Sequence, residues 1–231
     1  MNAFNAVTVV SDIIIAFAGL VFTILEYRKK KNEERRLEKE KEIIGKMTEE
    51  IGTVNKGIEI TNELINGFNE AYEMSRTTTD AGILINRFME PANEFVGQIQ
   101  NVISSIEALY EELLRNESNF SLSYGFDRII NACRQILLVS STQDFSKLSL
   151  PYKLQYYIKN AQDLKKEAER IMAAGGNLQP SDQENLGILT NNMYQMANSI
   201  ELDLQTFRPY LLETKIKFEK ISESLEGKKF S

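Results

Sequence analysis

The longest apolar run of the chain lies close to its start, between Val7 and Leu25, and reads VTVVSDIIIAFAGLVFTIL. Hydroxyl residues, Asp12 and Gly19 are its only interruptions. Built as one α-helix, the run would cover roughly 28 Å, close to the hydrocarbon thickness of a bilayer. The pattern therefore predicts that residues 1–27 form a short outer N-terminus and a single transmembrane helix.

The charges around this run predict its orientation. No charged side chain precedes Asp12, whereas Arg28, Lys29, Lys30 and Lys31 follow the run almost at once. A cleavable signal peptide carries positive charge before its apolar part, so we interpret the run as a retained anchor. The positive-inside rule then places the N-terminus outside and the C-terminal body in the cytoplasm of a bacterial-type inner membrane. We expect the four basic residues to contact anionic lipid headgroups. The alternative is a helix buried in a soluble core, although the dense charge that follows would be hard to bury there.

Residues 28–76 combine a charged segment with a regular apolar repeat and are predicted to form a stalk helix. Nine basic and five acidic side chains lie between residues 28 and 46. Beyond them, apolar residues recur at alternating intervals of three and four, interrupted only by Thr61, which is the spacing of a coiled-coil seam. The predicted stalk-packing residues are Ile44, Met47, Ile51, Val54, Ile58, Ile65 and Phe68.

Residues 77–231 continue with helical patterns that helix breakers separate. The predicted helices cover 81–115, 122–141, 151–174 and 180 to the C-terminus. Gly175 suits a helix C-cap, and the spacing of Ser181 and Glu184 matches a capping box. The predicted fold is therefore all-α, with one N-terminal transmembrane helix, a charged heptad-patterned stalk helix and a cytoplasmic multi-helix bundle.

The composition removes most routes to catalysis. The chain has no histidine, no tryptophan and a single cysteine, Cys133, which excludes histidine-dependent triads, histidine or multi-thiolate zinc sites and internal disulfides. Cys133 falls on an apolar helical stripe and is expected in the core. Tyr152, Tyr156 and Tyr157 could frame a ligand pocket, but aromatic residues at helical spacing usually pack in a core. We expect no enzymatic activity, no cofactor and no metal.

The net charge of −6 is unevenly distributed along the chain. Residues 47–231 carry 18 basic and 26 acidic side chains. An acidic body of this kind does not attract a phosphate backbone, so nucleic acid is not an expected partner.

The predicted transmembrane helix carries most of its polar or small side chains on one face. An intramembrane carboxylate such as Asp12 is costly against lipid, so we expect copies of the helix to shelter it together. The predicted pore-lining or oligomer-interface residues are Thr8, Ser11, Asp12, Ile15, Gly19, Phe22, Thr23 and Glu26. In the milder alternative, Asp12 and Glu26 lie near the two membrane surfaces, and Ala16 and Gly19 only form a close helix contact.

These features lead to the hypothesis of a non-enzymatic, homo-oligomeric, single-pass membrane protein. The helical cytoplasmic body would assemble the anchors, and the assembled spans would act on the membrane as a pore or permeability effector. In architecture this outline resembles the small membrane effectors that accompany bacterial antiviral defence systems. The alternative is a membrane-tethered scaffold whose body binds a cytosolic protein partner.

Overall fold

The computed structural model describes the backbone of residues 3–75, 81–116, 126–138, 148–175 and 179–227. Side chains are described from Phe22 onward, except those of residues 71–75 and 81–90 and several at the C-terminal end. Within these ranges every regular element is an α-helix, which confirms the predicted all-α fold. The helices are α1 (Ala3–Ser75), α2 (Ala81–Asn116), α3 (Phe126–Leu137), α4 (Leu150–Ala173) and α5 (Pro180–Gly227).

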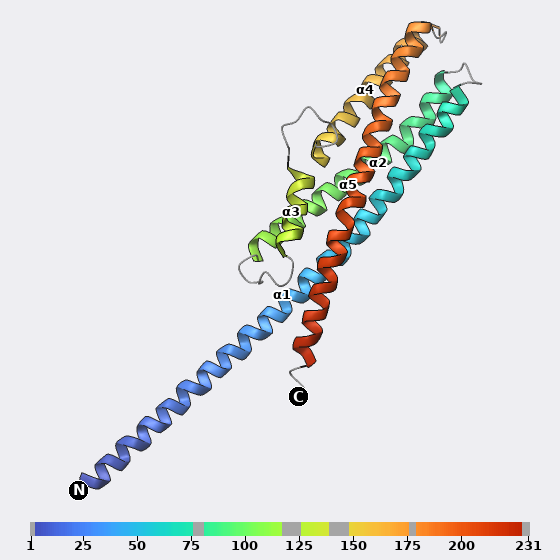
Figure 1. Ribbon diagram of the computed structural model, residues 1–231. Helices are drawn as coiled ribbons and strands as arrows, with labels where there is room; N and C mark the ends of the chain where they lie inside the picture. The colour runs from blue at the N-terminus through green and yellow to red at the C-terminus, as the bar shows by residue number, and fades with distance from the viewer. Residues whose placement is uncertain (1–2, 76–80, 117–125, 139–147, 176–178, 228–231) are drawn as a thin grey trace.

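The helices form an antiparallel bundle with four columns (Figure 1). α1 runs in one direction and α2 returns beside it, after which α3 and α4 follow the direction of α1 and α5 returns. Both α1 and α4 contact α2 and α5, while the short helix α3 packs against α2 and α5. The arrangement is an up-down-up-down bundle whose third column is divided between α3 and α4.

α1 is one uninterrupted helix of 73 residues, about 110 Å long. Its N-terminal part, residues 3–39, projects from the bundle, and we call this part the arm (Figure 1). From Phe22 onward, where side chains are described, the first buried ones along α1 are those of Glu40 and Ile43. The bundle therefore begins inside segment 28–76, which the sequence pattern assigns to a separate stalk.

None of the helices, as far as side chains are described, contains a stretch long and apolar enough to cross a membrane. The side chains of residues 7–21, the greater part of the predicted span, are not among those that the structure describes. Its last four residues, Phe22 to Leu25, are exposed on the arm.

The core is a continuous apolar cluster to which all five helices contribute. The antiparallel register pairs Phe95 of α2 with Tyr157 of α4, whose ring centroids lie 4.7 Å apart. At the other end of the bundle the rings of Phe126 in α3 and Phe218 in α5 lie 5.9 Å apart. Because edge and face contacts of this kind add to the burial of apolar surface, the two aromatic pairs help to hold the divided third column onto its neighbours.

The end of α4 and the start of α5 show specific backbone conformations and hydrogen bonds. Gly175 has φ +98°, a left-handed conformation that favours glycine after the end of a helix. At the start of α5, the Asp182 carboxylate accepts a hydrogen bond of 3.0 Å from the backbone N–H of Gln179. The cap thus involves Gln179 and Asp182, whereas the spacing of Ser181 and Glu184 predicts a capping box two residues later. In the third column, α3 ends at Leu137, before the end of the helix expected over 122–141; residues 122–125 and 139–141 of that prediction lie outside the described residues.

Candidate functional site

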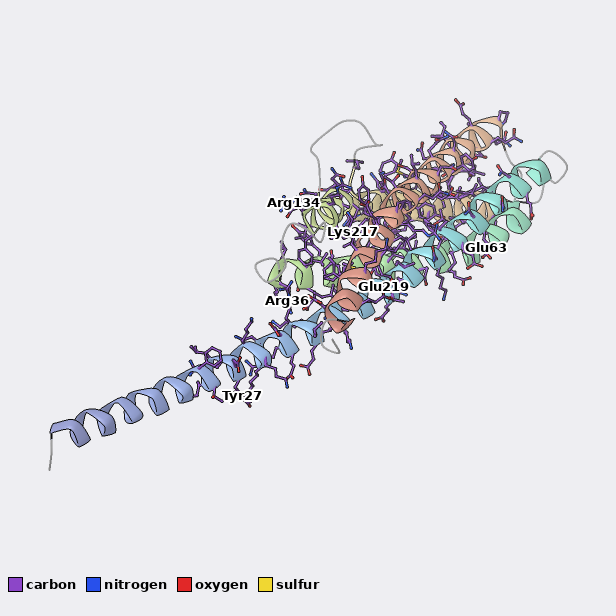
Figure 2. All side chains as sticks on the ribbon, turned by 60° about the horizontal axis from the view of Figure 1, so that its bottom comes forward. Tyr27, Arg36, Glu63, Arg134, Lys217 and Glu219 are labelled. Carbon is purple, nitrogen blue, oxygen red and sulfur yellow. The ribbon has the colours of Figure 1, made fainter. Side chains whose placement is uncertain are left out.

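The arm carries exposed apolar side chains in the part where its side chains are described. The exposed fractions of Phe22, Leu25 and Tyr27 are 62%, 57% and 66%, and Tyr27 lies on the projecting helix far from the other elements (Figure 2). Among the predicted interface residues, Thr23 and Glu26 are likewise exposed. The side chains of the remaining ones, Thr8, Ser11, Asp12, Ile15 and Gly19, lie outside those that the structure describes.

The charged segment continues the arm towards the bundle. Arg28, Lys29, Lys30 and Lys31 are all exposed, so they are accessible to a charged surface. Further along, the guanidinium of Arg36 donates to the Glu40 carboxylate at 3.1 Å, an i,i+4 pair of the kind that supports a helix. From Arg28 to Lys39 the arm is thus a mostly charged helix whose side chains are largely exposed.

A second set of charges lies where α1 enters the bundle and joins it to α2. The Lys46 ammonium lies 2.9 Å from Glu42 in α1 and 3.1 Å from Glu112 in α2. Its hydrogen bond to Glu42 is the main cause that raises the pKa of Lys46. The hydrogen bond from Lys46 is likewise the main cause that lowers the pKa of Glu112. These partly exposed pairs orient α1 against α2 and contribute little stability.

The predicted stalk-packing residues belong to the bundle. Met47, Val54, Ile65 and Phe68 are buried in the core. Ile44, Ile51 and Ile58 are partly buried and pack against it. Since α2 and α5 are the helices that α1 contacts, they cover this seam within one chain.

Among the buried charged residues that were not predicted from the sequence, Lys153 and Glu50 contact a neighbouring helix. The Lys153 ammonium in α4, whose side chain is 1% exposed, lies 2.6 Å from Asp203 Oδ2 in α5. Burial raises the pKa of Asp203, and the hydrogen bond from Lys153 opposes that shift. Glu50 in α1 is 2% exposed and accepts a hydrogen bond from the Ser105 hydroxyl of α2. Glu50 stands beside Glu49 in a charged stretch, whereas Lys153 is the one charged residue between Leu148 and Ile158; neither position shows from the sequence that the side chain is buried.

The other residues considered for chemistry lie in different surroundings in the described structure. Tyr152 is exposed and Tyr156 is partly buried, whereas Tyr157 is buried and its hydroxyl has no hydrogen-bond partner among the described residues. Cys133 lies in the core, as expected, and burial raises its pKa to about 12. No group of three acidic or cysteine side chains suited to a metal ion occurs in the described part of the chain.

Comparison with known proteins adds no functional assignment, because no family model, curated protein or solved structure matches the chain.

Proposed function

We propose that this protein is a non-enzymatic, single-pass membrane protein whose helical body and membrane anchor are joined by one rigid helix. In this proposal residues 1–27 are the outer N-terminus and the span, and the bundle lies on the cytoplasmic side. The span associates with copies of itself, and the assembly changes the permeability of the membrane, as in the bacterial defence effectors that it resembles in outline.

The observation that supports this proposal most directly is the continuity of α1. The helix that begins at Ala3 reaches the bundle core at Ile43 and ends at Ser75. A helix without a break transmits displacement and rotation along its length, whereas a flexible linker would absorb them. Any change in the packing of α1 in the bundle would therefore reach the N-terminal apolar run.

The packing of the seam bears on where copies of the chain could meet. Met47, Val54 and Phe68 are buried within a single chain, so these side chains are not available for a coiled coil between chains. Between Arg28 and Lys39 the arm is mostly charged and offers no apolar repeat. We therefore assign self-association to residues 1–27, where Asp12 needs shelter from lipid.

A leakage experiment tests this proposal. Purified full-length protein is reconstituted into liposomes that contain a small fluorescent dye, and dye release is followed after reconstitution. We expect release from the wild-type protein and an altered rate for Asp12→Ala and Phe22→Ala, because both residues lie on the predicted interface. Ile24→Ala, on the opposite side of the same helix, is the matched control and should release dye like the wild type.

The mass of the detergent-solubilised complex separates the competing interpretations. An oligomer whose liposomes stay tight would favour the membrane-tethered scaffold that binds a cytosolic partner. A monomer in a native-like bilayer would contradict the proposal, because Asp12 would then face lipid without a neighbour.

A further inference from the structure

Glu50 is an acidic side chain enclosed by the bundle. It lies on α1 and is 2% exposed. The Ser105 hydroxyl of α2 donates a hydrogen bond to its Oε2 atom. Its Oε1 atom is buried and has no hydrogen-bond partner among the described residues. A carboxylate in this setting lacks the donors that normally compensate for the loss of water.

The cations nearest in sequence or register are bound to other groups. On α1, Lys46 pairs with Glu42 and Glu112. On α3, Arg134 lies 3.4 Å from the Tyr110 hydroxyl of α2. In α4, Lys153 pairs with Asp203 of α5.

The remaining groups that face Glu50 do not neutralise it either. The register that brings Gly57 against Leu204 places Leu211 of α5 near the level of Glu50, and Leu211 is apolar and buried. One turn further, Thr214 of α5 donates its hydroxyl to the Tyr210 carbonyl, and the neighbouring Glu213 pairs with Arg128 and Lys217. The adjacent Glu49 adds a second negative charge, which disfavours ionisation of Glu50.

The protonation of Glu50 is therefore controlled by its surroundings. Burial is the main cause that raises the pKa of Glu50 to about 7, against the smaller opposing effect of the Ser105 hydrogen bond. A protonated carboxyl is tolerated in an apolar core far better than a carboxylate. Ionisation therefore favours any rearrangement that lets water reach Glu50.

The element most exposed to such a rearrangement is α3. This helix has only 12 residues, and it is held by buried side chains on one face, including Ile129, Cys133 and Ile136. Cys133 lies on that face, and the charge of Glu50 contributes to the raised pKa of its thiol. The inner face of α3 thus lies within electrostatic range of the Glu50 carboxyl. A short helix attached along one face is also the kind of element that opens before the rest of a fold.

We propose that Glu50 is a proton-controlled latch: the protonated carboxyl allows α3 to pack on the bundle, and the ionised carboxylate releases α3. The sign follows from linkage, because a group whose pKa is raised on packing stabilises the packed state at low pH. That stabilisation falls as the pH rises from the ordinary pKa of glutamate to about 7 and is level above that. This inference concerns the bundle alone and does not rest on the membrane proposal.

Cys133, the only cysteine of the chain, provides a direct test. The full-length protein is treated with a thiol-specific maleimide between pH 5 and pH 8, and its labelling rate is divided by that of Glu50→Gln at each pH. The ratio removes the intrinsic pH dependence of the thiol. We expect the ratio to rise at least about ten-fold and to level off near pH 7, since glutamine keeps the shape of the side chain without its charge.

Two further variants complete the design. Glu63→Gln changes an exposed glutamate of α1 and should label like the wild type at every pH. Ser105→Ala removes the hydroxyl that favours the ionised form, so its labelling should level off at a higher pH than that of the wild type. If the Glu50→Gln protein loses its helicity, the labelling rates of Ser105→Ala and of the wild type are compared directly. A labelling rate that levels off at the same pH in both proteins would contradict the proposal.

A ratio that does not change with pH would overturn the latch. So would a loss of helicity by circular dichroism in step with labelling, because the whole bundle would then open rather than α3 alone.

Discussion

At the scale of single residues, the buried pair of Lys153 and Asp203 allows a prediction about the free energy of unfolding. The ammonium is almost fully enclosed, and the carboxylate oxygen lies 2.6 Å away. Removing one partner of a buried ion pair leaves a desolvated charge behind, which typically costs about 3–5 kcal/mol. We therefore expect Asp203→Ala to lower the free energy of unfolding by about that amount, measured by urea denaturation of the detergent-solubilised protein.

The matched control is the double variant Lys153→Met, Asp203→Leu, which replaces both charges with apolar groups. Since an apolar replacement avoids the cost of burying charge, its stability should lie within about 2 kcal/mol of the wild type. Equal losses for the single and the double variant would contradict this interpretation of the pair.

At the scale of elements, the packing of α1 depends on the absence of a side chain at Gly57. A Cβ atom there would lie 2.9 Å from Val102 Cγ2 and 3.1 Å from Leu204 Cδ1, so α1 approaches both α2 and α5 at this point. We expect Gly57→Leu to lower the free energy of unfolding by about 1–3 kcal/mol through overpacking. Thermal or urea denaturation measures the change.

Gly52, one and a half turns earlier on α1, is the control for Gly57. A Cβ atom there would have no heavy atom within 4 Å, and the residue is exposed. Gly52→Leu should therefore raise the free energy of unfolding by about 0.5–1 kcal/mol, the gain in helix propensity over glycine. The same sign of change at both positions would show that helix propensity, rather than packing, governs this helix.

The start of α5 gives a prediction with a pH dependence. Asp182 accepts from the Gln179 backbone N–H and from the Arg170 guanidinium of α4. The backbone hydrogen bond is the main cause that lowers the pKa of Asp182, and Arg170 adds to it. A lowered pKa means that the stabilisation is present above the ordinary pKa of aspartate and is lost as the pH falls through the lowered value.

Asp182→Ala should consequently lower the midpoint of thermal unfolding by roughly 2–4 °C at pH 7, the usual effect of a lost helix cap in a chain of this length. The difference between the variant and the wild type should shrink as the pH falls below 4, which calorimetry over a pH series can measure. Ser181→Ala, at the neighbouring exposed position, is the control and should leave the midpoint nearly unchanged.

At the scale of the whole molecule, the arm and the bundle should be separable. Residues 22–35 are exposed along their whole length, so the bundle does not depend on them for burial. We expect a chain that lacks residues 1–35 to keep the thermal midpoint of the bundle within about 2 °C, which corresponds to less than ~1 kcal/mol. Removal of residues 1–50 should lower the thermal midpoint by more than this, because it takes away the buried side chains of Ile43 and Met47.

The amino-acid pattern alone determines much of this protein. The intervals of three and four from Ile44 to Phe68 predict a helix with one apolar face, and the breakers near Gly175 and Pro180 predict where helices end. These features act through neighbouring residues in the chain, so they can be recognised without knowledge of the partners. The positive charges after Leu25 similarly support the proposed orientation of a span.

Only the tertiary structure decided which surfaces these helices cover. The seam of α1 packs against α2 and α5 of the same chain, although its heptad spacing suits a stalk equally well. Gly57, Lys153 and Glu50 resemble helix-weakening or solvated residues in the sequence, yet the bundle encloses all three. The physical reason is that burial depends on the rotation and register of helices far apart in the chain, and no local pattern specifies these.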